Sequence, residues 1–244
     1  MSRDRSRSRP ILISFSGIDG AGKSTQIEIL CTRLCQAGLR VGLLAFWDDV
    51  ALLTRFREVT SHSVFRSEEG IGAPGRPVNR HDKNVQSWYM TPLRFFLYFL
   101  DAMSLCLAVA KSEESEVDVV IFDRYLYDEL ANLPLDRPLT RTYARLLLNL
   151  VARPDIAYLL DAEPTEARER KPEYPLEFLH GNRAAYLSLS EMGGMTVIAA
   201  GSVQSVATRI MRIFLKKFPV ARLTDFDQVN AAPQAWNQVQ ESAS

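Results

Sequence analysis

The sequence predicts a single α/β domain in which a five-stranded parallel sheet lies between two layers of helices. Three observations support this three-layer α/β/α fold class. Five short apolar runs alternate with segments of helical periodicity, which is typical of parallel strands joined by helices. The length of 244 residues suits one large domain. A glycine-rich loop separates the first apolar run from the first helical segment.

Each element is placed by its own local signal. Strands are expected where apolar and β-branched residues run together, at 11–16, 41–46, 117–122, 156–160 and 195–199. Helices are expected where apolar residues recur three and four positions apart, at 26–36, 51–59, 92–111, 140–151, 176–191 and 203–218. The domain then spans 11–218, with an irregular insertion at 61–91, a disordered tail at 1–10 and a polar tail at 219–244.

Composition and charge exclude several classes of protein. The 29 basic and 29 acidic residues leave no net charge that would favour specific nucleic-acid binding. The most apolar stretch, 95–110, is interrupted by Asp101 and is too short to cross a membrane, and the Arg/Ser-rich N-terminus lacks the apolar core of a secretory signal. The three cysteines, at positions 31, 35 and 106, are interpreted as buried thiols of a reducing compartment, and we expect a cytoplasmic protein.

The segment 17–25 fits the phosphate-binding pattern G-x-x-x-x-G-K-[ST]. Glycines let backbone N–H groups surround phosphate oxygens, and the following helix adds its positive dipole. Nucleotide contacts are therefore expected from Gly17, Gly20, Ala21, Gly22, Lys23, Ser24 and Thr25. Lys23 is expected to reach the β- and γ-phosphates of ATP, and the Ser24 hydroxyl to ligate Mg²⁺. The sequence thus predicts a P-loop NTPase fold with ATP and Mg²⁺ as cofactors.

Charged residues also follow the other strands. Asp48 and Asp49 come after the second expected strand, Asp123 and Arg124 after the third, and Asp161 after the fourth. Because ligands of such sheets bind at the carboxyl ends of the strands, we expect these residues to gather beside the phosphate loop. Asp123 could orient metal-bound water or the acceptor, or could simply pair with its neighbour. The pair Asp48-Asp49 could contact sugar or metal, or could cap a helix.

Three stretches resemble the thymidylate kinases among the P-loop nucleoside monophosphate kinases. These stretches are Phe15–Gln26, Val119–Tyr125 with its Asp-Arg-Tyr motif, and Tyr158–Lys171. The resemblance implies a basic lid at 163–175, a nucleotide substrate and a homodimer, for which the long helix from Pro92 is suitable. It also implies that Asp19 approaches the acceptor sugar, that Arg124 holds the acceptor phosphate and that Arg168 or Arg170 contacts the transferring phosphoryl group. Gly20 stands where some members carry an arginine, as in the subgroup whose catalytic arginines come from the lid.

Two departures concern the acceptor. The second strand runs into Phe46-Trp47-Asp48-Asp49, where the family has an Arg-Glu-Pro-Gly-Gly segment. Tyr98 occupies the position of a base-stacking aromatic residue, but Ala102 stands where an arginine would hydrogen-bond to thymine. An arginine in or beside the insertion could substitute for the missing ones: Arg66, Arg76, Arg80 or Arg94.

Several alternatives stay open at this point. Tyr98 could be a core residue, and Arg168, Arg170 and Lys171 could form a solvated helix face. The leading hypothesis is phosphoryl transfer from ATP to a nucleoside monophosphate, with dTMP first. A kinase of a nucleoside or another small phosphate acceptor is the second hypothesis, and a non-catalytic nucleotide-binding switch or assembly protein is the third.

Overall fold

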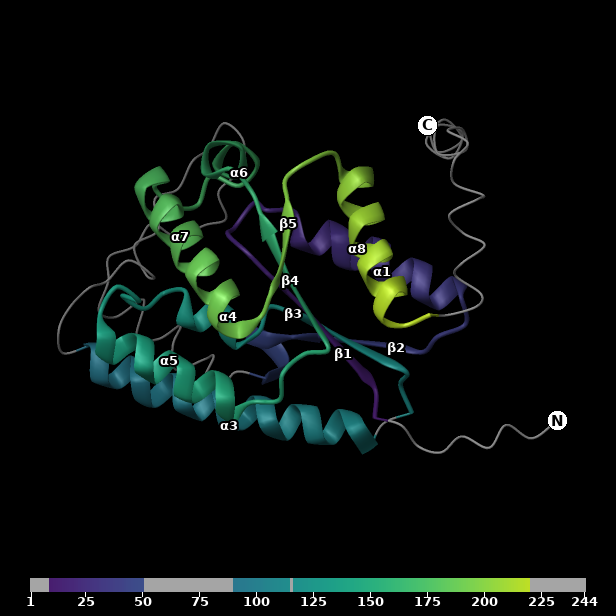
Figure 1. The fold of residues 1–244 in the computed structure, drawn as a ribbon, viewed down its shortest axis with the longest axis horizontal. Coiled ribbons are helices and arrows are strands. Elements are labelled where there is room, and N and C mark those ends of the chain that lie inside the picture. The colour runs from purple at the N-terminus through teal and green to yellow at the C-terminus, as the bar shows by residue number, and fades with distance from the viewer. Residues whose placement is uncertain (1–8, 51–89, 115, 220–244) are drawn as a thin grey trace.

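The fold is seen in a computed structural model that describes residues 9–50, 90–114 and 116–219 (Figure 1). Its sheet contains β1 (Ile11–Ser16), β2 (Val41–Ala45), β3 (Val119–Asp123), β4 (Ile156–Asp161) and β5 (Thr196–Ala199). All pairs are parallel and the spatial order is β2-β3-β1-β4-β5. The predicted five-stranded parallel sheet is therefore confirmed, and β1, which leads into the phosphate loop, lies at its centre.

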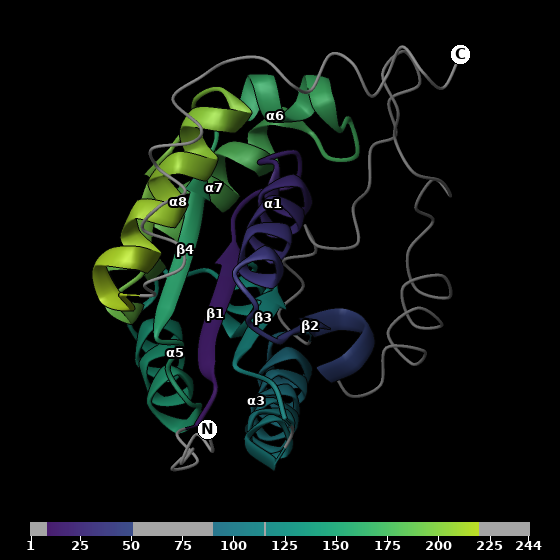
Figure 2. The ribbon, with the colours of Figure 1, turned by 90° about the vertical axis from the view of Figure 1, so that its right-hand side faces the viewer.

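Helices cover both faces of the sheet (Figures 1 and 2). One face carries α1 (Lys23–Gln36) and α8 (Val203–Lys217), and the other carries α3 (Met90–Glu114), α4 (Leu126–Leu130), α5 (Pro138–Leu150) and α7 (Leu176–Gly193). Successive side chains of a strand enter opposite cores. Leu12 packs in the core under α3, α4, α5 and α7, whereas its neighbour Ile13 packs under α1 and α8. This double burial explains why the strands are apolar runs rather than alternating patterns.

The structure differs from the prediction at several boundaries and short elements. The second strand ends at Ala45, one residue early, because Phe46 turns into the core as the first residue of a π-helical turn, η1 (Phe46–Val50). Two short helices were not predicted, α4 and α6 (Pro164–Arg170), since five and seven residues are too few for a periodic signal. The predicted helix at 51–59 and residues 61–89 of the insertion lie outside the described residues.

The structure also shows the surroundings of Arg9 and of the three cysteines. Arg9, assigned to the N-terminal tail, pairs with Asp155 at 2.8 Å. The three cysteines are free thiols, but Cys35 is exposed, so the expectation that all three are buried is wrong. Its position on the solvent side of α1 explains the difference.

The helix α3 is more apolar than the sequence analysis allowed. By length and composition alone, residues 95–113 could cross a membrane, with a mean hydropathy of 1.5 and 33% of the segment buried. One side of the helix nevertheless belongs to the core, where Tyr98, Ala102, Leu105 and Val109 are buried. Asp101 is also fully buried. These contacts are those of a core helix with a second, apolar outer face.

Candidate active site

The predicted site residues meet at the carboxyl edge of the sheet. Phe15 of β1 pairs with Asp123 of β3 on one side and with Tyr158 of β4 on the other. The phosphate loop therefore leaves the sheet between the ends of β3 and β4, with Asp123 and Asp161 at its flanks. The helix α6 follows β4 directly and lies over the same edge (Figure 1).

The backbone of the phosphate loop requires its glycines. Gly17, Gly20 and Gly22 have φ values of 143°, 84° and 85°, which side-chain-bearing residues rarely adopt. A Cβ at Gly17 would lie 2.6 Å from the Leu160 carbonyl oxygen, and one at Gly20 would lie 2.1 Å from that of Ala167. The loop is thus packed against both β4 and α6. The space beside Gly22 is open, and Ser24 and Thr25 follow it as exposed residues in the first turn of α1.

Lys23 is folded back onto the loop that it belongs to. Its Nζ donates hydrogen bonds to the carbonyl oxygens of Gly17 at 2.8 Å and Ile18 at 3.0 Å. Burial, followed by the proximity of the Arg124 guanidinium, lowers the pKa of this amine from 10.5 to about 8, although nearby carboxylates oppose the shift. An anion entering the loop would supply a stronger partner than two neutral carbonyls.

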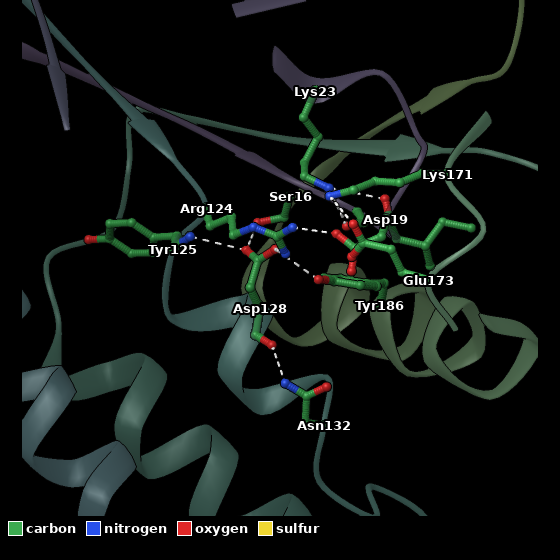
Figure 3. Close-up of polar contacts among 12 residues, drawn as sticks. Ser16, Asp19, Lys23, Arg124, Tyr125, Asp128, Asn132, Lys171, Glu173 and Tyr186 are labelled. Atoms are coloured by element: carbon green, nitrogen blue, oxygen red, sulfur yellow. Dashed lines mark hydrogen bonds and ion pairs between the residues drawn. The ribbon is translucent and has the colours of Figure 1, made fainter. Parts of the chain in front are cut away.

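Arg124 lies at the centre of a buried polar network (Figure 3). One end of its guanidinium donates to Asp19 Oδ1 at 2.5 Å, and the other donates to Asp128 Oδ1 at 3.4 Å. Burial alone would lower the pKa of Arg124, but these two carboxylates raise it above its ordinary value. Its φ of 73° is unusual for a residue other than glycine, and its backbone N–H is held by Phe15 at 3.0 Å. Strained backbone of this kind concentrates at functional sites.

Asp128 is a site residue that was not predicted from the sequence. Its carboxylate is buried and accepts hydrogen bonds from Ser16 Oγ at 2.6 Å, the Tyr125 N–H at 3.0 Å and the Tyr186 hydroxyl at 2.8 Å. Burial, followed by the proximity of this carboxylate, raises the pKa of Tyr186 well above its ordinary value. A sequence signal existed, because Asp128 and Glu129 are two adjacent charged residues in the otherwise apolar segment after the Asp-Arg-Tyr motif.

The lid segment has ion pairs near both of its ends. Arg183 of α7, a residue that the sequence analysis did not select, donates to Asp161 at 2.6 and 3.0 Å and to Glu163 at 2.7 Å. Lys171 pairs with the buried Glu173 at 3.3 Å. The Arg183 contacts therefore tie the start of the lid segment to α7, whereas the Lys171–Glu173 pair lies within the segment itself.

The two candidate lid arginines have different surroundings. Arg168 is half-buried, whereas Arg170 is exposed and pairs with Glu166 of its own helix at 3.6 Å. Arg170 thus has the surroundings of the solvated face that the sequence left open. This difference favours Arg168 as the arginine that faces the site.

The remaining residues predicted for the site take part in fewer of the contacts described above, or lie outside the described residues. Asp123 is half-buried, and burial raises the pKa of its carboxyl, while Arg124 and Lys23 oppose the shift. Tyr98 is buried in the core beside Ala102, and its proposed stacking on a base stays a prediction. The backbone of Asp48 and Asp49 forms part of η1. The side chains of Asp48 and Asp49 lie outside the described residues, as do those of the insertion arginines (Arg66, Arg76, Arg80 and Arg94).

Comparisons with known proteins agree on one family. The chain is 23% identical over 233 residues to the thymidylate kinase of Pelodictyon phaeoclathratiforme, covering 86% of this chain and 97% of that protein. It is 30% identical over 165 residues to the thymidylate kinase of Chlorobium luteolum, covering 66% of each. The crystal structure of thymidylate kinase from Ehrlichia chaffeensis superposes with a TM-score of 0.55 at 17% identity, over 85% of this chain and 99% of that one. No protein-family model matches the chain.

Proposed function

The chain belongs to the thymidylate kinase family, and on this premise we propose that it transfers the γ-phosphoryl group of ATP to dTMP, forming ADP and dTDP. The coarser activity, a nucleoside monophosphate kinase, is what its relatives indicate. One observation carries the proposal. The phosphate loop with Lys23 and the Asp19–Arg124 pair lie at the same sheet edge, under α6. Donor and acceptor groups can therefore be held on two sides of one transfer path.

The donor half is the phosphate loop. Backbone N–H groups at the start of α1 lack partners within the helix, and they can bind the phosphate oxygens of ATP. Lys23 would exchange its carbonyl partners for phosphate oxygens. The exposed Ser24 hydroxyl and the Asp123 carboxyl are oxygen donors of the kind that Mg²⁺ prefers, and these residues would hold it. When bound, Mg²⁺ neutralises charge on the phosphate oxygens.

The acceptor half is the Asp19–Arg124 pair, with Tyr98 of α3 as the proposed base-stacking residue. In this proposal Arg124 exchanges Asp19 for the acceptor phosphate, which leaves the Asp19 carboxylate for a sugar hydroxyl. Arg168, rather than the exposed Arg170, contacts the transferring group from the lid. Such contacts act by orientation and by charge neutralisation, since phosphoryl transfer requires little covalent help from protein.

The test is ADP release with a panel of nucleoside monophosphates in the presence of ATP and Mg²⁺. We expect turnover with dTMP, and loss of turnover without loss of folding in Lys23→Ala. Equal slow hydrolysis with and without every acceptor would refute the kinase and favour a nucleotide-dependent switch.

A second acceptor class is favoured by one specific contact. Arg124 is already paired with two carboxylates, so it is less available to a phosphate dianion than an unpaired arginine would be. A nucleoside or another small hydroxyl-bearing acceptor would not need to break the Asp19 pair. Turnover with thymidine that exceeds turnover with dTMP would establish this alternative.

We further propose a cytoplasmic homodimer that associates through the outer face of α3. Four exposed apolar residues follow one stripe of this helix: Phe96, Phe99, Met103 and Leu107. Leu107 is 71% exposed, and an apolar stripe of this length is typical of an interaction surface. Light scattering after size exclusion should give twice the chain mass, and Leu107→Asp should give the chain mass. The matched Val203→Asp variant, at an exposed apolar residue of α8, should remain dimeric.

A further inference from the structure

We propose that Asp128 is a positioning residue of the kinase site, which fixes Arg124 for the acceptor and ties it to the phosphate loop and the lid helix. This inference rests on the proposed function. It concerns a residue that does not itself contact substrate, because its carboxylate is fully buried beneath Arg124. Arg124 instead offers its other end, toward Asp19, to the acceptor side.

The two carboxylates around Arg124 are not equivalent. The side chain of Asp128 has no exposed surface, whereas that of Asp19, in the glycine loop, is 10% exposed. An incoming anion can replace Asp19 without disturbing the buried side of the guanidinium. Asp128 then remains as the partner that keeps Arg124 in place, while the exposed end changes partners.

Asp128 also connects three separate parts of the chain. It receives the hydroxyl of Ser16, the last residue before the phosphate loop, and the hydroxyl of Tyr186 on α7. It receives the N–H of Tyr125, next to Arg124, and so caps the short helix α4. Figure 3 shows these donors converging on the one carboxylate. The hydroxyls could rotate to suit an amide, but a peptide N–H and a guanidinium cannot accept a hydrogen bond.

The contact with Tyr186 extends this connection to the lid. Tyr186 lies on the same helix as Arg183, which holds Asp161 at the end of β4 and Glu163 just before α6. The position of the lid relative to Arg124 is thus set through α7 as well as through the phosphate loop. A kinase needs donor, acceptor and lid in one register, and misplacement of about 1 Å can cost about 100-fold in rate.

The decisive experiment is a double-mutant cycle on kcat/KM for the acceptor. Asp128→Asn should lower this constant about 100-fold in the wild-type background. In the Arg124→Ala background, Asp128→Asn should lower kcat/KM by no more than about twofold, because the residue that Asp128 positions is gone. The KM for ATP should change less than the KM for the acceptor. Equal losses in both backgrounds would overturn the inference and leave Asp128 a purely structural residue.

A matched control separates positioning from loss of stability. Asp155→Asn makes the same change at an aspartate that also holds an arginine and a backbone N–H, Arg9 at 2.8 Å and Leu12 at 2.9 Å, before the start of β4. It should lower the melting temperature but leave kcat/KM within about twofold. A loss of activity equal to that of Asp128→Asn would count against a specific role.

Two further measurements test the role of Asp128 if Asp128→Asn does not fold or if the protein turns over no acceptor. If Asp128→Asn does not fold, the Ser16→Ala/Tyr186→Phe variant keeps the carboxylate and removes two of its donors. It should lose about tenfold in kcat/KM, and the loss should disappear with Arg124→Ala. If the wild type turns over no acceptor, the proposed function fails by itself. The guanidinium NMR signals of Arg124 then decide: they should be restrained in the wild type and averaged in Asp128→Asn, and unchanged signals would refute positioning.

Discussion

Replacing Lys23 with methionine should abolish turnover and, at neutral pH, leave the protein as stable as the wild type or more stable. The amine is buried against two backbone carbonyls, and among the described residues no carboxylate forms an ion pair with it. Methionine has a similar length and no charge to bury. The variant therefore separates the contribution of this lysine to phosphate binding from its cost in folding.

The magnitude follows from the titration of the amine. Its pKa falls from 10.5 in the unfolded chain to about 8 in the folded protein, chiefly through burial. At neutral pH the buried charge therefore costs about 3 kcal/mol. The unfolded state binds more protons between these two values, so the free energy of unfolding of the wild type rises as the pH passes from about 8 to 10.5. Loss of two hydrogen bonds in the variant offsets about 1–3 kcal/mol of the gain.

The assay is urea unfolding of wild type and Lys23→Met over this pH range. The difference in free energy between variant and wild type should decrease by about 2–3 kcal/mol from about pH 7 to pH 10. Tyrosines that titrate late are common to both proteins and cancel. The control is Lys216→Met, the same change at an exposed lysine of α8, which should show no such pH dependence. A Lys23→Met difference that stays constant with pH would refute the buried-charge reasoning.

Two further predictions concern the glycine loop and the lid. Gly20→Ala should destabilise the protein by about 1–3 kcal/mol more than Gly22→Ala in urea unfolding, because only the first Cβ would meet the Ala167 carbonyl. Equal costs would mean that α6 is not packed on the loop. Arg168→Ala should lower kcat about 100-fold, whereas Arg170→Ala should stay within about threefold, since its guanidinium is turned to the exposed face. The reverse order in steady-state kinetics would assign the catalytic lid arginine to position 170.

Most of the fold could be predicted because its strands are buried and therefore have a simple, apolar sequence pattern. β1 and β4 are covered on both faces, so each appears in the sequence as an unbroken apolar run. The end of β2 was predicted less well, since Phe46 is as apolar as a strand residue but enters the core from a π-helical turn. The short helices α4 and α6 are stabilised by packing against other helices, α3 and α7 for α4 and α7 for α6. A local sequence pattern does not indicate such long-range packing.

The candidate site was predicted unevenly for a similar reason. The phosphate loop is local, and its residues are recognisable from spacing alone. The partners of Arg124 are not: Asp19 lies 105 residues away, and the Ser16–Asp128 and Tyr186–Asp128 contacts span 112 and 58 residues. The sheet order sets β1 beside β3 and so brings Ser16 and Asp19 to Asp128 and Arg124, and the packing of α7 on α4 adds Tyr186.

The two cations of the site are balanced in different ways, and this difference has a consequence for ligand binding. Lys23 faces neutral carbonyls, so a bound polyphosphate would relieve the cost of burying its charge. Arg124 is already paired with Asp19 and Asp128, so an acceptor phosphate competes with two carboxylates for its charge. The donor half is therefore the stronger anion site. Binding of ATP above about pH 8 should take up a proton on Lys23, whereas acceptor binding should depend on how firmly Asp128 holds Arg124.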